Sequence, residues 1–95
     1  MDIEDQIYIG RIKNGQPAAY SFLVDKYKHM VYTISIKILP NAEDAEDAAQ
    51  ESFIKAYQQI NTFAGKSKFS TWLYTITYRS IKRFGWLQKT DTFII

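Results

Sequence analysis

Apolar residues recur every three or four positions in four stretches of this chain. The stretches cover about residues 3–13, 17–39, 41–61 and 70–84. A period near 3.6 residues puts such side chains on one face of an α-helix, so each stretch is predicted to be an amphipathic helix. β-branched residues are frequent in 32–38 and 72–78, where a strand is arguable, but the helical stripe continues through both and packing overrides propensity. The pattern therefore predicts an all-α fold, a compact bundle of about four helices.

Residues that start or stop helices separate the four stretches. Asn14-Gly15-Gln16-Pro17 divides the first from the second, because Gly suits a helix C-terminus and Pro suits a first turn. Pro40 ends the second helix, and Asn41 is a good N-cap for the third, with Asp44 three residues on as in a capping box. The signals for the fourth helix are a cap at Ser67 or Ser70 and a stop at Gly85.

One face of each predicted helix is expected to point into the core. On the first helix this face carries Ile3, Ile7 and Ile12. On the second it carries Ala19, Tyr20, Leu23, Tyr27, Met30, Val31, Ile34 and Ile38. On the third it carries Ala45, Ala49, Ser52, Phe53, Ala56 and Ile60, and on the fourth Phe69, Leu73, Ile76, Thr77, Ser80, Ile81 and Phe84. The small residues of the third helix predict close contact with its neighbours.

The outward face of the third helix combines charges with two large apolar side chains. It carries Glu43, Asp47, Gln50, Ile54, Tyr57 and Asn61, flanked by Glu46 and Glu51. An acidic helix face is usually a solvated surface, but Ile54 and Tyr57 lie in line with the charges. Apolar residues within a polar rim are typical of a protein interface, although a second core contact would leave the same pattern.

The outward face of the fourth helix is basic and aromatic. It carries Thr71, Tyr74, Thr75, Tyr78, Arg79 and Lys82, with Arg83 at its edge and Lys66 and Lys68 in the loop before it. Cations bind phosphates, hydroxyls bind phosphates or base edges, and aromatic rings stack on exposed bases. This mixture suits single-stranded or partly opened DNA, while solvated lysines beside tyrosines that cover the core are the simpler interpretation.

The charges are divided along the chain in the same way. Residues 1–51 contain nine acidic and five basic side chains, whereas residues 52–95 contain seven basic and one acidic. No carboxylate side chain lies between Glu51 and Asp91. This asymmetry favours a basic face for nucleic acid and an acidic face for another partner.

Composition argues against most catalytic and metal sites. The chain has no cysteine and a single histidine, His29, which is expected at a surface or edge position. We therefore expect no enzyme activity, no metal, no cofactor and no small-molecule substrate. No apolar run approaches the roughly 20 residues of a membrane span, and the acidic start is unlike a signal peptide, so the expected location is cytoplasmic.

Two motifs resemble one known family. Residues 41–57, NAEDAEDAAQESFIKAY, resemble region 2.2 of the extracytoplasmic-function (ECF) sigma factors of bacterial RNA polymerase. Residues 68–83, KFSTWLYTITYRSIKR, are similar to regions 2.3 and 2.4 of that family. Residues 19–27 and Val31-Tyr32 also fit its opening helix, so the resemblance covers roughly residues 5–84. Two motifs in the right order make a specific signal.

The resemblance implies a helical domain with two partners. Region 2.2 would bind the clamp helices of the polymerase β′ subunit, and the matching positions are Asp44, Asp47, Gln50, Glu51, Ile54 and Tyr57. The loop Phe63–Lys68 would receive a flipped base of the non-template strand of the promoter −10 element, and the fourth helix would support the strand. The DNA-binding positions are Phe63, Lys66, Ser67, Lys68, Ser70, Thr71, Trp72, Thr75, Tyr78, Arg79 and Lys82. An anti-sigma factor is expected to mask one of these faces.

The resemblance also divides the chain and leaves alternatives. Residues 1–84 would form the region 2 domain and residues 85–95 a tail or the start of an interdomain linker, while nothing matches the family's region 4. One alternative is a helical interaction module that binds an acidic regulator without touching DNA. Another is a helix-turn-helix repressor, which the eight-residue loop before Ser70 disfavours.

Overall fold

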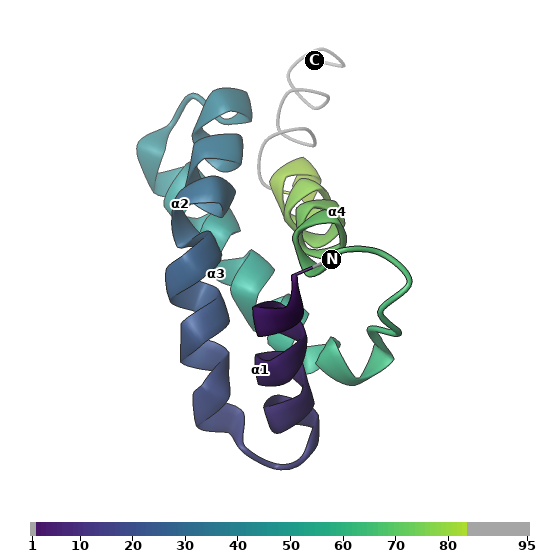
Figure 1. The fold of residues 1–95 in the computed structure, drawn as a ribbon. Coiled ribbons are helices and arrows are strands. Elements are labelled where there is room, and N and C mark those ends of the chain that lie inside the picture. Colours follow the sequence, from purple (N-terminus) through teal and green to yellow (C-terminus); the bar gives the residue numbers. More distant parts are fainter. Residues whose placement is uncertain (1, 84–95) are drawn as a thin grey trace.

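The computed structural model describes residues 2–83, and four α-helices dominate this part of the chain (Figure 1). They are α1 (Ile3–Lys13), α2 (Tyr20–Ile38), α3 (Ala42–Gln58) and α4 (Phe69–Ile81), with short 3-10 turns at Pro17–Ala19 (η1) and Ile60–Thr62 (η2). The predicted all-α fold is confirmed. Phe84, the stop at Gly85 and the tail 85–95 lie outside the described residues. None of the helices within residues 2–83 is both long and apolar enough to span a membrane.

The arrangement brings α1 next to the chain that enters α4. In Figure 1, α1 lies alongside α2, and α3 packs against both α2 and α4. After α3, η2 turns the chain outward, and the segment 63–68 returns past the N-terminal end of α1 before α4 begins. The predicted second helix differs at its start, because Pro17 opens a separate 3-10 turn before α2.

Helix α3 begins with a side-chain cap, whereas α4 begins without one. Asn41 caps α3, since its side-chain oxygen accepts from the backbone N–H of Glu43 at 2.8 Å and of Asp44 at 3.2 Å, as predicted. The prediction that Ser67 or Ser70 caps α4 is wrong. Lys68 stands at the cap position without a side-chain hydrogen bond, and the Ser67 hydroxyl donates to the Lys68 carbonyl at 3.4 Å. Burial of the Phe69 ring holds the start of α4 instead.

The inward face of α1 also differs from the prediction. Ile3 and Ile7 are 72% and 51% exposed, whereas Asp5, Ile9 and Ile12 are buried. Asp5, Ile9 and Ile12 form a helical stripe as well, so the pattern alone allowed two orientations. Polar partners on α2 make the charged stripe the inward one, as the contacts of Asp5 show below.

The core consists of a large and a small cluster of apolar side chains. The large one joins all four helices around Leu23, Val31, Leu73 and Ile76, and the small one lies around Leu39, Ala45, Ala48 and Ile81. Where helices pass close together, buried hydroxyls donate to the carbonyl four residues earlier. They are Ser35 to Val31 at 2.8 Å, Ser52 to Ala48 at 2.7 Å and Thr77 to Leu73 at 2.9 Å. Small residues thus permit close approach without unpaired polar groups at these three positions.

Candidate protein and nucleic-acid interfaces

The outer face of α3 presents carboxylate, amide and apolar side chains together. Asp47, Gln50, Ile54 and Tyr57 are all exposed, and Asp44 is half-buried. Ile54 is 58% exposed and Tyr57 is 40% exposed, so the interpretation of these two residues as a second core contact is wrong. An exposed isoleucine and tyrosine within a rim of carboxylates and amides form a surface suited to a protein partner.

A shallow apolar depression lies beside Ile54, and Tyr20 of α2 forms one wall. The depression is lined by Tyr20, Phe53, Ile54, Tyr57 and Gln58. The Tyr20 hydroxyl donates to the Phe53 carbonyl at 2.6 Å, and its ring lies 5.0 Å from that of Tyr57. Burial raises the pKa of Tyr20, so this hydroxyl stays protonated as a donor. The sequence placed Tyr20 in the core stripe, and its part in this wall was missed because it depends on a contact across 33 residues.

Glu51 differs from the other predicted polymerase contacts. Its side chain is 22% exposed, and Oε1 accepts from the Arg83 guanidinium at 2.8 Å, with the Lys55 ammonium at 3.9 Å. Oε2 is buried without a hydrogen-bond partner in the described part of the chain. Glu51 therefore lies at the seam between α3 and α4 rather than at the centre of the outer face.

The outer face of α4 is basic, hydroxylated and aromatic, as the sequence predicts. Its exposed residues are Thr71, Tyr74, Thr75, Tyr78, Arg79 and Lys82, while Ser70 and Trp72 are half-buried. The Lys82 ammonium stands over the Tyr78 ring, 5.6 Å from its centroid. The loop residues Lys66, Ser67 and Lys68 are exposed beside the start of this helix. Residues 63–83 contain no carboxylate side chain, so this segment itself presents no like charge to a polyanion.

Phe63 was predicted to contact DNA, but the structure buries its side chain in the core. Its side chain is only 6% exposed, and its ring packs edge-on against Phe69 at 5.8 Å and against Trp72 at 5.1 Å. Phe63 thus anchors the loop from inside, and the accessible surface begins after it. No local sequence pattern predicts this burial, because the residues around the ring come from α4 and α1.

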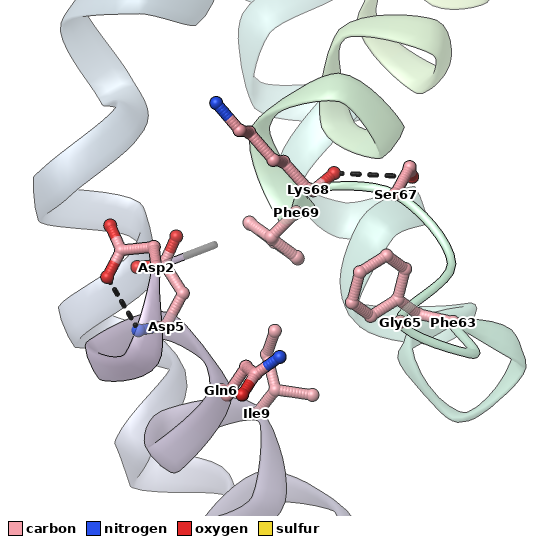
Figure 2. Close-up of a pocket in the computed structure, with 9 residues that line it drawn as sticks. All are labelled: Asp2, Asp5, Gln6, Ile9, Phe63, Gly65, Ser67, Lys68 and Phe69. Atoms are coloured by element: carbon pink, nitrogen blue, oxygen red, sulfur yellow. Dashed lines mark hydrogen bonds between the residues drawn. The ribbon is translucent and has the colours of Figure 1, made fainter.

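A small pocket separates the loop from α1, and sequence reasoning missed its α1 side. Figure 2 shows the loop residues Phe63, Gly65, Ser67 and Lys68, with Phe69 of α4, on one side of the pocket and Asp2, Asp5, Gln6 and Ile9 on the other. Gly65 has a φ of +75°, a backbone conformation that glycine adopts without strain, and it turns the loop at this point. The pocket joins an apolar floor to carboxylates on one side and Lys68 on the other.

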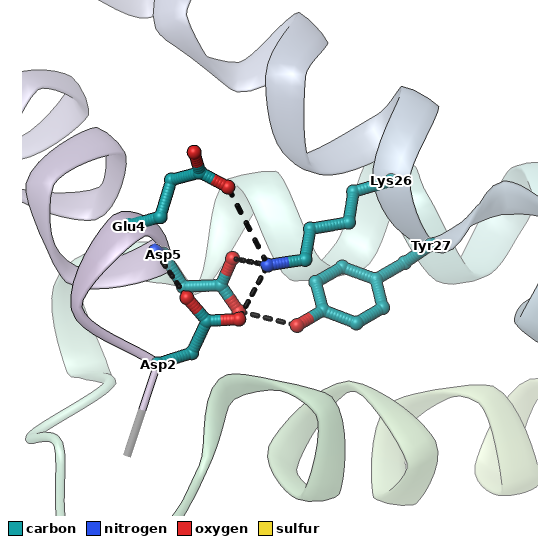
Figure 3. A network of polar contacts seen from close by, with 5 residues as sticks. All are labelled: Asp2, Glu4, Asp5, Lys26 and Tyr27. Carbon is teal, nitrogen blue, oxygen red and sulfur yellow. Dashed lines mark hydrogen bonds and ion pairs between the residues drawn. The ribbon is translucent and has the colours of Figure 1, made fainter.

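The carboxylates of α1 are held by a polar network with α2 (Figure 3). The buried Asp5 carboxylate accepts from the Lys26 ammonium at 2.8 Å and from the Tyr27 hydroxyl, and Lys26 also pairs with Asp2. The hydrogen bond from Lys26 lowers the pKa of Asp2, and the bonds to Asp2 and Asp5 raise the pKa of Lys26. Burial, reinforced by the bond to Asp5, raises the pKa of Tyr27 to about 12. The network fixes the N-terminal end of α1 on α2.

Comparison with known proteins assigns this helical domain to a class. The family model of Sigma-70 region 2 matches residues 23–91, so the chain belongs to the sigma-70 region 2 family. Its curated relatives place it among the ECF sigma factors. It is 39% identical to the RNA polymerase sigma-H factor of Pseudomonas aeruginosa over 79 residues, which cover 83% of this chain and 41% of that protein. It is 37% identical to the ECF RNA polymerase sigma-E factor of Escherichia coli (strain K12) over 82 residues, 86% of this chain and 42% of that one.

A solved structure supports the same assignment. An engineered region 2 of sigmaE, determined in complex with GTAAAA, superposes with a TM-score of 0.78 at 36% identity, covering 88% of this chain and 90% of that one. The predicted membership of the ECF region 2 domains is confirmed. The chain spans about two fifths of the length of the curated relatives it matches.

Proposed function

We propose that this sigma factor domain serves transcription initiation by binding the polymerase β′ clamp helices through α3 and the non-template strand of the promoter −10 element through the 63–68 loop and α4. The observation that carries the proposal is the separation of two exposed faces on one small bundle. One face combines carboxylates with Ile54 and Tyr57, and the other combines cations, hydroxyls and rings of residues 63–83, a segment that contains no carboxylate side chain. Binding to polymerase would locate this activity in the cytoplasm.

The proposed clamp contact has an apolar centre and an acidic rim. Ile54 and Tyr57 supply apolar surface that a partner helix can cover, next to the depression walled by Tyr20. Asp44, Asp47 and Gln50 surround them and favour a basic partner. Glu51 joins this contact only from the edge, because Arg83 already pairs with it.

In the proposed DNA contact, the domain binds a strand that has become unpaired and uses no chemical energy to separate the duplex. Extruding a base costs a few kcal/mol, and stacking returns about 1–3 kcal/mol per base. The rings are those of Trp72 and Tyr78, and the donors belong to Lys66, Ser67, Lys68 and Arg79. The same face also carries Ser70, Thr71, Thr75 and Lys82. The related region 2 of sigmaE was determined in complex with GTAAAA, which supports a nucleic-acid role for this face. An anti-sigma factor that masks either face remains a prediction.

Charge reversal on α3 tests the polymerase contact. Asp47→Arg should abolish co-purification with core polymerase, because it places a cation against a basic partner at the edge of the apolar centre. Glu4→Arg on α1 is the matched control, since its side chain is 62% exposed and pairs at 3.9 Å with Lys26 of α2 rather than with a residue of α3. Circular dichroism should show the same helicity for both variants, as exposed substitutions change stability little. Retention of polymerase by Asp47→Arg at wild-type level would refute the assignment of this face.

A further inference from the structure

Lys13 links α1 directly to the segment that precedes α4. It is the last residue of α1, and its ammonium group donates to the Phe63 carbonyl at 2.6 Å, across 50 residues of sequence. Lys13 and all of α1 lie outside residues 23–91, the part matched by the family model. The bond is charge-assisted and partly buried, which is the strong class of hydrogen bond.

The acceptor of this bond lies at the point where the loop leaves the core. The rings of Phe63 and Phe69 are buried and in contact, so the loop has two fixed ends. Between them lie five residues, 64–68, of which Lys66, Ser67 and Lys68 are exposed. The Phe63 carbonyl, which accepts from Lys13, belongs to the first peptide group of this exposed segment.

The donor side is rigid as well. Asp5 and Asp2 tie the beginning of α1 to Lys26 and Tyr27 of α2 (Figure 3). Ile9 and Ile12 are buried farther along α1, and Lys13 is the last residue of the helix. Across the pocket of Figure 2, the same helix faces Gly65, Ser67 and Lys68. A loop that is already held against a helix loses less conformational entropy when single-stranded DNA binds to it. Preorganisation of this kind raises affinity.

We propose that Lys13 is a positioning residue that sets the conformation of the 63–68 loop for single-stranded DNA without touching the DNA itself. This inference rests on the proposed function, because it assumes that the loop is a DNA contact. Lys13 differs in two ways from Lys66 and Lys68. It belongs to a different element, and its ammonium group is occupied by a backbone carbonyl.

The test compares Lys13→Met with Lys13→Arg. Methionine keeps most of the side-chain length and removes the donor and the charge, whereas arginine keeps both. Lys28→Met on α2 is the charge-matched control, since Lys28 is an exposed lysine paired only loosely with Asp25 at 3.5 Å. The probe is a 12-nucleotide single strand with GTAAAA at its centre. Three quantities are measured: the 15N relaxation of residues 64–68 in the free protein, the Kd, and the dependence of Kd on salt.

Lys13→Met is expected to increase the motion of residues 64–68 and to raise the Kd about three- to tenfold. This is less than the full effect of losing a charged hydrogen bond, because DNA binding is weakened only by the added cost of ordering the loop. Its salt slope should equal that of Lys28→Met, and Lys13→Arg should restore both the loop order and the Kd. A slope flatter than that of Lys28→Met by roughly 0.7 would mean that Lys13 binds a phosphate, which overturns the proposal. Unchanged loop motion or unchanged Kd in Lys13→Met would also overturn it.

Failure of the proposed function itself would look different. The wild-type protein would then show no salt-dependent binding to the probe, and the Lys66→Ala and Lys68→Ala variants would behave like it. In that case the positioning role for DNA falls with the function, and the relaxation data alone decide whether Lys13 orders the loop.

Discussion

Tyr27 and Lys26 show how single residues set the pH range of this fold. Both groups surround the buried Asp5 carboxylate, and both have a raised pKa in the folded chain, with that of Tyr27 at about 12. The folded state therefore holds these protons more tightly than the unfolded state, in which both pKa values lie near 10. The stabilisation is complete below pH 10 and is lost as the pH rises from 10 towards 12.

Tyr27→Phe should reduce the slope of the free energy of unfolding against pH in this alkaline range. The reduction should correspond to at most about one bound proton per molecule. Urea unfolding at several pH values between 9 and 12 measures the slope, and the value at pH 7 gives the separate cost of the lost hydrogen bond. Tyr20→Phe should act in the same direction, because burial raises the pKa of Tyr20 as well. If Tyr27→Phe keeps the wild-type slope, the Tyr27 hydroxyl does not hold its proton more tightly in the folded chain than in the unfolded chain.

The sequence predicted the exposure of some residues correctly and missed that of residues with partners far along the chain. The helical wheel placed Ile54 and Tyr57 outward, and the structure exposes both. The same wheel put Glu51 at the edge of the outward face, and the family resemblance made Phe63 a surface group that contacts DNA. Phe63 is buried because Phe69 and Trp72 receive its ring, and Glu51 is half-buried because Arg83 reaches it from 32 residues away. Such pairings depend on how helices cross, which no local pattern contains.

Among the helices, α3 shows why small residues matter to the whole bundle. Ala45, Ala48 and Ala56 are fully buried where α3 packs against α2 and α4. The predicted close contact is confirmed at Ala45, Ser52 and Ala56, whereas Ala49 is only half-buried and Ala48, which the sequence did not place inward, is buried. A larger side chain at such a position must force the helices apart, since interiors are packed like crystals.

Ala48→Leu is therefore expected to destabilise the domain by about 1–3 kcal/mol, the usual cost of overpacking a core. Ala42→Leu is the matched control, because Ala42 is exposed in the first turn of the same helix and should change stability by less than about 0.5 kcal/mol. Urea denaturation measures both. Equal stability of the two variants would mean that α3 can move away from its neighbours at little cost.

Helix existence was easier to predict than helix orientation. The periodic pattern located all four helices, and the predicted cap Asn41 begins α3 as expected. For α1 the pattern admitted two faces, and the choice was decided by Lys26 and Tyr27, which pair with Asp5. The role of α1 as a wall of the loop pocket could not be predicted, because it arises from the return of the chain past α1.

For the whole molecule, the sequence asymmetry of charge becomes a separation in space. The acidic half contributes the outer face of α3, and the carboxylate-free residues 63–83 contribute the loop and α4. Glu51 and Arg83 meet at the seam between the two faces. If the two faces bind different partners, a substitution on one face should leave binding by the other face unchanged.

The most direct test is the salt dependence of binding to the 12-nucleotide GTAAAA strand by the wild type, Asp47→Arg, and the alanine variants of Lys66, Lys68 and Arg79. Each alanine variant should flatten the plot of log Kd against log salt by roughly 0.7–1, since each removes one phosphate contact. Asp47→Arg, which is expected to lose polymerase, should show a slope no flatter than wild type. A slope that is the same in all five proteins, or one that Asp47→Arg flattens as much as Arg79→Ala does, would contradict the division of the molecule into a polymerase face and a DNA face.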